Sequence, residues 1–340
     1  MEKYHKILSK IKYYRIICFF VIVITLVLGF VFRGFVKNGA QKYRDQLVYK
    51  EWDESGQTAQ ISVFVKESAD VNADFILNFE KRLEQSLTSE GIEPQNENAR
   101  LYTDCFSTKC EITLASDRKS TTVSCLAVGG DFFRFHPVEL VNGTYFTEDD
   151  LSKDTIILDE ETAWLLFGGN DVTGKEVYLK DRALLVRGVY HREQDEVSIH
   201  ARGDYPEIYI PYELTDYYME TPNLTTYEIC LPNPVKGFAF AMVNNNFVID
   251  GNDAEFVENS DRFGYENLWN VFKDRKFRMM QNNDILLPYW EKVARFEEDE
   301  LAPKTVVMFA MFITAFITFT GWGLYELMKL TALKKKEPDN

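Results

Sequence analysis

Two apolar stretches without a charge, IICFFVIVITLVLGFVF (Ile16–Phe32) and VVMFAMFITAFITFTGWGLY (Val306–Tyr325), decide how this chain of 340 residues is organised. The first continues past a charged position as far as Val36, so each provides about the 20 residues that a helix needs to cross a bilayer. A buried core helix rarely stays uncharged over this length. We therefore predict two transmembrane helices, over residues 16–36 and 304–328.

The flanking charges predict the orientation. Residues 1–15 carry five basic residues against one acidic residue, and the tail over residues 329–340 carries four lysines against two acidic residues. Since basic flanks stay in the cytoplasm, both termini are expected inside the cell (plasma) membrane and residues 37–303 outside. The segment RGFVK (33–37) lacks a small-x-small cleavage site, which indicates an uncleaved signal anchor.

The segment between the two stretches is strongly acidic, since residues 33–303 hold 28 basic and 49 acidic residues. This charge argues against nucleic acid or anionic lipid as the partner of the outer domain. The run EEDE (Glu297–Glu300), just before the second stretch, is most simply a solvated face.

Five cysteines bear on disulfides and metals. Cys18 lies in the first apolar stretch. The others lie where disulfides persist, at Cys105, Cys110, Cys125 and Cys230. Three pairings are possible; a bond between the first two would close a small hairpin and is favoured, whereas the last two occupy strand-like runs and are more simply buried thiols. These cysteines form no zinc pattern with the outer histidines, so no metal or other cofactor is predicted.

The start of the chain predicts a short amphipathic helix over residues 1–15. Its apolar residues recur at three- and four-residue spacing, with lysines on the opposite side. We call them the N-terminal apolar face: Tyr4, Ile7, Leu8 and Ile11. Two interpretations are open, since the helix either lies on the membrane surface or docks onto a cytoplasmic partner; the residues alone favour the membrane surface.

The outer segment predicts an α+β fold. Its first part, residues 37–128, contains a strand–helix–strand unit, with an alternating strand at Gln60–Glu67 and a helix with an apolar stripe at Asn72–Ser89. Further strands are predicted at Ala99–Tyr102, Cys110–Ala115 and Thr121–Val128.

Residues 129–220 differ, because short strand-like runs and turn residues predict a β-rich insertion. One helix, at Glu160–Phe167, interrupts the strands. The strands are predicted at Thr155–Leu158, Glu176–Leu179, Ala183–Tyr190 and Glu207–Ile210, and turns are predicted at Asn142-Gly143 and at residues 168–171.

In residues 221–303 the first pattern returns, with strands at 225–232 and Leu268–Phe277 and a helix between them at Val235–Asn244. A last helix, Leu286–Glu300, leads into the second apolar stretch. The simplest assembly pairs this part with the first in one α+β domain, which the β-rich insertion interrupts.

No motif predicts catalysis. Residues 169–175, GNDVTGK, have the spacing of a nucleotide-binding loop, but Glu176 stands where Ser or Thr must hold magnesium, and the loop follows a helix instead of a strand. His136, within the apolar DFFRFHPVEL, is more simply structural than catalytic, and the polar segment His191–His200 is predicted to be a loop. We therefore expect a protein that is not an enzyme and has no catalytic residues.

An ordered set of residues lies between Val128 and Tyr190. It comprises Gly143, Phe146 and Asp150, then Leu158, Ala163, Leu166, Phe167 and Gly168, and then Gly174, Lys175, Val177 and Gly188. This set resembles the MacB-like periplasmic core domain of ABC transporter permeases, in the FtsX-like superfamily. The segments LPNPVKGFA (231–239) and LPYWEKVAR (287–295) also resemble this group, so the resemblance covers the outer segment and both flanking stretches.

The resemblance implies a split, porter-like domain over residues 37–128 and 221–303, with a sabre-like insertion at residues 129–220. It also implies that the helix before the first span contacts the cytoplasmic ATPase. With the resemblance taken into account, docking of the N-terminal apolar face onto the ATPase is favoured over anchoring at the membrane surface.

The resemblance further implies a membrane subunit of an ABC transport system, which transmits motion between a cytoplasmic ATPase and an extracytoplasmic domain for export or envelope-related work. Permeases of this group usually have four spans, whereas this chain ends eleven residues after Lys329. A further permease subunit or a second copy of the chain is therefore expected, besides membrane lipid and with no nucleic acid. The alternative is a stand-alone, membrane-anchored sensor or binding protein with the same outer fold.

Overall fold

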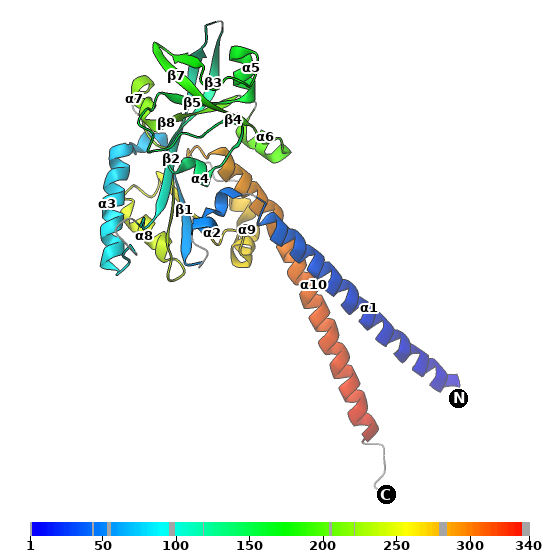
Figure 1. Ribbon diagram of the computed structural model, residues 1–340. Helices are drawn as coiled ribbons and strands as arrows, with labels where there is room; N and C mark the ends of the chain where they lie inside the picture. Colours follow the sequence, from blue (N-terminus) through cyan, green and yellow to red (C-terminus); the bar gives the residue numbers. More distant parts are fainter. Residues whose placement is uncertain are drawn as a thin grey trace. The chain divides into compact units, whose positions relative to one another are not determined.

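The computed structural model describes residues 2–42, 44–52, 56–94, 99–117, 119–203, 206–220, 222–278 and 284–334, with the backbone alone at residues 2–12, 276–278 and 332–334. The chain divides into two compact units, and Figure 1 labels most of their helices and strands. Unit 1 takes residues 1–42, 263–280 and 297–340, and unit 2 takes residues 43–262 and 281–296.

Unit 1 is helical. It contains α1 (Glu2–Gly39), α9 (Tyr265–Arg278) and all but the start of α10 (Tyr289–Lys334). Both α1 and α10 include a segment that is long and apolar enough to cross a membrane, which confirms the two predicted spans. α1 has no break near residue 16, because neither Pro nor Gly occurs before Gly29; the short helix predicted over residues 1–15 is therefore the first part of one long helix.

The two spans pack against each other as an antiparallel pair. Near one end, the guanidinium of Arg15 donates to both carboxylate oxygens of Glu326, at 2.7 and 2.5 Å. Further along, the ring of Phe30 meets that of Phe312 edge to face, with 5.4 Å between ring centroids. The pair is thus held by both charge and apolar contact.

Unit 2 is built on one ten-stranded sheet. Its first part comprises β1 (Thr58–Val65), α3 (Ala73–Ser89), β2 (Thr103–Ala115), β9 (Thr226–Pro232), α8 (Phe238–Asn246) and β10 (Ala254–Glu258). The strands lie in the order β10-β1-β9-β2 and are antiparallel, so two strand–helix–strand halves from distant parts of the sequence interleave. This arrangement confirms the predicted pairing of the two halves in one α+β domain.

The last strand of the first part, β3 (Ser120–Gly130), pairs with β2. The β-rich insertion continues the sheet from β3 in the order β8-β5-β7-β4, and β6 pairs with β7 and with the end of β2. Its elements are α4 (Phe132–Phe135), β4 (Glu139–Gly143), β5 (Thr155–Asp159), α5 (Glu160–Phe167), β6 (Glu176–Leu179), β7 (Arg182–His191), α6 (Glu196–Arg202), β8 (Glu207–Pro211), η3 (Tyr212–Leu214) and α7 (Thr215–Tyr218). Short elements before and after β1 are η1 (Arg44–Gln46), α2 (Val48–Trp52) and η2 (Glu67–Ala69).

Local sequence explains α3, which was predicted at Asn72–Ser89 and begins one residue later. The side chain of Asn72 accepts a hydrogen bond from the backbone N–H of Phe75 at 3.0 Å, which caps the first turn. Its apolar stripe, Ile76, Phe79 and Leu83 among others, is fully buried in the larger of the apolar clusters of unit 2. Capping and periodicity therefore fix this element before any tertiary contact is considered.

Residues 268–277 form a helix, α9, so the strand predicted there is wrong. Their apolar side chains, including Leu268, Val271 and Phe272, recur at three- and four-residue spacing, which is typical of a helix rather than a strand. The last strand of the second half is β10 instead, which pairs with β1.

Three smaller predictions also fail. Ala99–Tyr102 is not a strand, since pairing with β9 begins at Thr103. Asn142-Gly143 ends strand β4 rather than forming a separate turn; Gly143 has φ 86°, and a Cβ there would lie 2.1 Å from the carbonyl oxygen of Arg187. Part of the segment predicted as a polar loop, His191–His200, is the helix α6, capped by Asp195.

The favoured disulfide is also wrong, since all five cysteines are free thiols. Cys105 and Cys110 lie on the single strand β2, where five residues separate their Cα atoms by about 16 Å. A disulfide needs less than about 7 Å. Cys125 on β3 and Cys230 on β9 are buried thiols on strands that β2 separates, as the alternative interpretation held.

The acidic run before the second span is not a uniformly solvated face. Glu297 and Glu298 are buried, and burial raises the pKa of Glu297. Glu300 is exposed and pairs with Lys304 one helical turn later, at 2.9 Å. The expectation of solvation therefore holds for one end of the run and fails at the other, because α10 packs one face of this turn within unit 1.

Candidate functional site

A chain of hydrogen-bonded polar side chains crosses the interior of unit 2. We call it the buried polar network; it consists of Asp45, His136, Glu228, Ser62, Asn259, Arg262 and Glu291. Its members come from η1, from the end of α4, from β9 and β1, from the loop after β10 and from the start of α10. Most of these side chains are buried, and each is hydrogen-bonded to another member, as buried polar groups in folded proteins usually are.

His136 lies next to Asp45, the member at one end of the network, and is 1% exposed. His136 directly follows the short helix α4 and precedes Pro137. Its backbone N–H donates a hydrogen bond of 2.8 Å to the carbonyl of Phe132, which completes the last turn of α4 and positions the ring. The ring lies 4.0 Å from that of Trp290, between centroids. Its Nδ1 contacts Oδ1 of Asp45 at 3.1 Å, and its Nε2 makes a very short contact with Oε2 of Glu228.

Glu228 joins the histidine to the sheet. It lies in the middle of β9, directly opposite Ser62 on β1 and Cys105 on β2. Its second carboxylate oxygen accepts a hydrogen bond from the Ser62 hydroxyl at 2.6 Å, and that hydroxyl accepts one from the Asn259 amide at 2.7 Å. Both carboxylate oxygens therefore have partners, which a buried charge requires.

The other end of the network is a guanidinium–carboxylate pair. Arg262 donates to Asn259 at 3.2 Å and to the two carboxylate oxygens of Glu291 at 2.6 and 2.8 Å. Arg262 and Glu291 are 3% and 1% exposed. Arg295, one turn along α10, donates to the same carboxylate at 2.6 Å and to Glu255 on β10 at 2.7 Å. The first turns of α10 are thus fastened to the sheet by two arginines.

The pKa values of His136 and Glu291, near the two ends of the network, are shifted by different groups. Burial alone would lower the pKa of His136, but the charge of Glu228 and the hydrogen bonds to Asp45 and Glu228 outweigh it and raise the pKa to about 9. The ring is therefore a cation at neutral pH and donates from both nitrogens. Burial would raise the pKa of Glu291, but Arg262 and Arg295 outweigh it and hold that pKa below its usual range.

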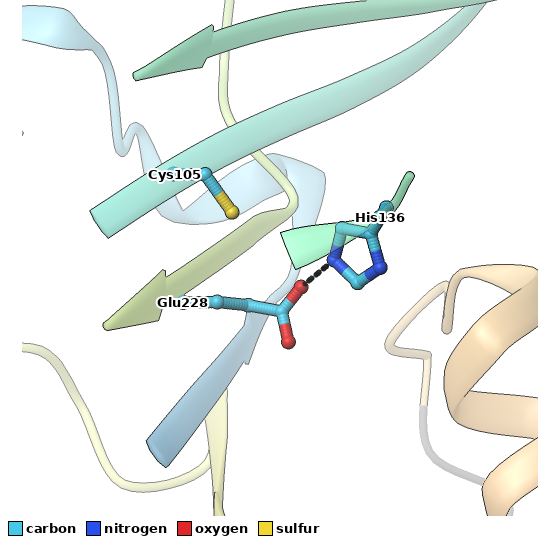
Figure 2. A group of neighbouring side chains, drawn as sticks. All are labelled: Cys105, His136 and Glu228. Atoms are coloured by element: carbon cyan, nitrogen blue, oxygen red, sulfur yellow. Dashed lines mark hydrogen bonds and ion pairs between the residues drawn. The ribbon is translucent and has the colours of Figure 1, made fainter. Parts of the chain in front are cut away.

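Figure 2 shows the residues that could hold a metal, Cys105, His136 and Glu228, whose potential ligand atoms lie within 4.8 Å of one another. Two observations count against a metal here. Both ring nitrogens of His136 already contact carboxylates. Burial and the charge of Glu228 also raise the pKa of the Cys105 thiol well above its ordinary value, whereas a metal needs the thiolate. These contacts are explained by a buried ion pair without a metal.

The structure places the residues singled out in the sequence as follows. The N-terminal apolar face lies on the backbone of α1, and its side chains are outside the described residues. His136 belongs to the buried polar network, in keeping with a structural residue. Lys175 follows a turn in which the N–H of Gly174 donates to the Val186 carbonyl at 2.8 Å, so GNDVTGK leads into β6 as a simple turn.

The remaining network residues were missed. Glu228 carried a signal, because it is a lone charge in the apolar strand TYEICLP. Arg262 and Glu291 carried none, because their pairing joins a loop and a helix that are 29 residues apart.

Comparisons with known proteins give one family match and several similar solved structures. The model of the MacB-like periplasmic core domain family matches residues 16–245. No curated protein matches the chain. Solved structures include the extracellular domain of the noncanonic ABC-type transporter YknZ from Gram-positive bacteria, with 14% identity over 58% of this chain and 99% of that one and a TM-score of 0.39.

Two other structures give similar values. The periplasmic region of MacB from Actinobacillus actinomycetemcomitans has 14% identity over 66% of this chain and 92% of that one, with a TM-score of 0.40. A domain of a permease protein from Porphyromonas gingivalis has 15% identity over 61% and 91%, with a TM-score of 0.35. The family match covers more than half of the chain, and the chain therefore belongs to the MacB-like periplasmic core domain family, whose members are ABC-type transporter permeases.

Proposed function

We propose that this chain is a membrane subunit of an ABC transport system, in which it transmits movement between a cytoplasmic ATPase and the extracytoplasmic domain. The observation that carries the proposal is the buried polar network. One of its ends holds η1, which follows α1 in the chain, and the other holds the start of α10, the helix that continues into the second span. Both segments next to the spans are thereby fastened to one sheet.

The fastening at η1 has a second component in Gln60 of β1, which is fully buried. Its side-chain oxygen accepts the N–H of Val48 at 3.1 Å, and its side-chain nitrogen donates to the Asp45 carbonyl at 2.6 Å. Because buried hydrogen bonds are costly to break, a displacement of η1 or of the start of α10 moves the sheet with it rather than sliding past it. This stiffness is what a transmitting element needs.

The basic charges of both termini support an orientation with both ends in the cytoplasm and residues 37–303 outside. The N-terminal apolar face then meets the cytoplasmic ATPase, and the chain acts together with a further permease subunit or a second copy of itself. The chain itself performs no catalysis, since hydrolysis of ATP belongs to the partner.

Affinity purification of the full chain from its native membrane, followed by mass spectrometry, tests the proposal. We expect an ABC ATPase to co-purify in near-stoichiometric amount. Replacing Ile7 and Leu8 with Asp should reduce its recovery at least tenfold, because two charges enter an apolar contact. Ser9→Asp, on the opposite side of the same helix, is the matched control and should leave recovery unchanged.

Purification of the intact chain without any ATPase would contradict the proposal and favour the stand-alone sensor. Equal loss of the ATPase in the Ser9→Asp variant would contradict the assignment of the N-terminal apolar face while leaving the transport role in place.

A further inference from the structure

Helix α9 is packed beside the outer ends of both spans within unit 1. Leu268 is fully buried and shares a small apolar cluster with Val36 of α1 and Leu301 of α10. The ring of Tyr265 meets that of Phe309 at 5.5 Å between centroids. α9 therefore touches both helices that cross the membrane, and these contacts set its level relative to the apolar core.

The level can be estimated along α10. Lys304 is the last charged residue before the apolar run, and at 1.5 Å per residue Phe309 lies about 7.5 Å further into that run. Leu301 lies about 4.5 Å from Lys304 in the other direction. The contacts of α9 thus straddle the boundary between lipid and water, the zone in which interfacial helices bury their apolar side chains by about 5–10 Å.

Three large aromatic side chains of α9 are only partly covered by the protein. Tyr265, Trp269 and Phe272 are 45%, 46% and 39% exposed, and the last two rings stack on each other. They follow helical spacing and flank the buried Leu268 on one side of the helix. Tyr and Trp are the residues enriched at membrane–water interfaces, because each ring combines an apolar body with a polar atom.

The charge of α9 is the reverse of that of the outer segment. Its last six residues, KDRKFR (273–278), hold four basic residues against one acidic residue, and the side chains of Lys273 and Arg275 are exposed. Residues 33–303 as a whole hold 28 basic against 49 acidic residues. Basic side chains next to an anionic membrane surface are attracted to it, because their charge is complementary to that of lipid phosphate.

From these observations we propose that α9 lies on the outer surface of the membrane, where its aromatic side chains enter the headgroup–acyl boundary and Lys273 and Arg275 bind anionic lipid headgroups. The proposal limits the earlier expectation that the acidic outer segment avoids anionic lipid, because that expectation averaged the charge over the whole segment. It does not depend on the proposed transport function.

Quenching of tryptophan fluorescence by brominated lipid tests the placement. The full chain is reconstituted into phosphatidylcholine vesicles with bromines at a shallow acyl position. The chain has five tryptophans. We expect Trp269→Phe to remove a part of the fluorescence that the brominated lipid quenches in the wild type. Trp164→Phe, on α5 in unit 2, is the matched control, since Trp164 is 59% exposed and should be quenched by aqueous acrylamide and not by the brominated lipid.

Three outcomes decide the placement. Quenching of Trp269 by lipid supports it. Quenching of Trp269 by acrylamide to the same degree as Trp164 overturns it, because the helix then faces water. Protection of Trp269 from both quenchers also overturns it, since a protein then covers the aromatic side chains.

The charge component needs a second measurement, with a small fraction of brominated phosphatidylglycerol in phosphatidylcholine vesicles. Quenching of Trp269 should exceed that given by the same fraction of brominated phosphatidylcholine. Lys273→Gln with Arg275→Gln should reduce this preference, by up to about fivefold for each basic residue. Lys81→Gln with Lys119→Gln, two exposed lysines of unit 2, should not change it, and an equal preference for both lipids in the wild type would overturn headgroup binding.

Discussion

The two ends of the buried polar network hold their segments by different chemistry. At the start of α10, Glu291 is paired with Arg262 and Arg295, whose guanidinium groups stay charged at any accessible pH. At η1, Asp45 is held through His136, whose charge depends on the carboxylates on either side of it. The comparison teaches that the attachment at the start of α10 is permanent, because its charges do not change with pH, whereas the attachment at η1 is conditional on the protonation of His136. Both lie in unit 2.

Breaking the permanent end should have the largest effect. Glu291→Gln leaves Arg262 buried without its anion, which typically costs about 3–5 kcal/mol. Thermal unfolding of the detergent-solubilised full chain should show a correspondingly lower midpoint. Glu300→Gln removes an exposed partner of Lys304 on the same helix and should change stability by no more than about 0.5 kcal/mol. Equal midpoints for the two variants would contradict the difference between them.

The conditional end should make stability depend on pH. The pKa of His136 is raised in the folded chain to about 9, from about 6.5 in an unfolded chain. The stabilisation is therefore complete below about pH 6.5 and is lost as pH rises through about 9, by roughly 3 kcal/mol at most. Unfolding midpoints measured from pH 6 to pH 10 should fall for the wild type.

His136→Gln should remove this fall, and His200→Gln, at an exposed position of α6, should keep it. A wild-type stability that rises over the same pH range would show that the ring is neutral in the folded chain.

The middle of the network should be weaker than either end. Ser62→Ala removes the donor to one oxygen of Glu228 and also a partner of Asn259, which should cost about 1–3 kcal/mol. Thr113→Ala, which removes one of two exposed threonine hydroxyls bonded across β2 and β3, should cost about 0.5 kcal/mol or less. If the two variants unfold at the same temperature, the bonds of Ser62 do not hold the network together.

The smallest effect is expected for metals. If Cys105, His136 and Glu228 form an ion pair and a neutral thiol, EDTA or added zinc should leave the unfolding midpoint of the full chain unchanged. If zinc raises the unfolding midpoint of the wild type and leaves that of Cys105→Ser unchanged, these residues form a metal centre. His136 would then be a neutral metal ligand and not a cation.

Much of the architecture was predictable because it follows from local patterns. The helix Asn72–Ser89 has a capping residue and an apolar stripe, and the strands Thr155–Leu158 and Glu207–Ile210 are short apolar runs bounded by polar residues. The candidate site was predictable only at His136, and there only as a structural residue. The domain bounds and the role of the N-terminal apolar face stay predictions.

The two spans and α3 were determined by the sequence alone, since hydropathy, capping and periodicity act between residues close in the chain. The free cysteines and the buried polar network were decided only by the tertiary structure. The contacts of His136 show why, because its two carboxylate partners lie 91 and 92 residues away in the chain. No local pattern records such a pairing, and its strength comes from burial that only the folded sheet provides.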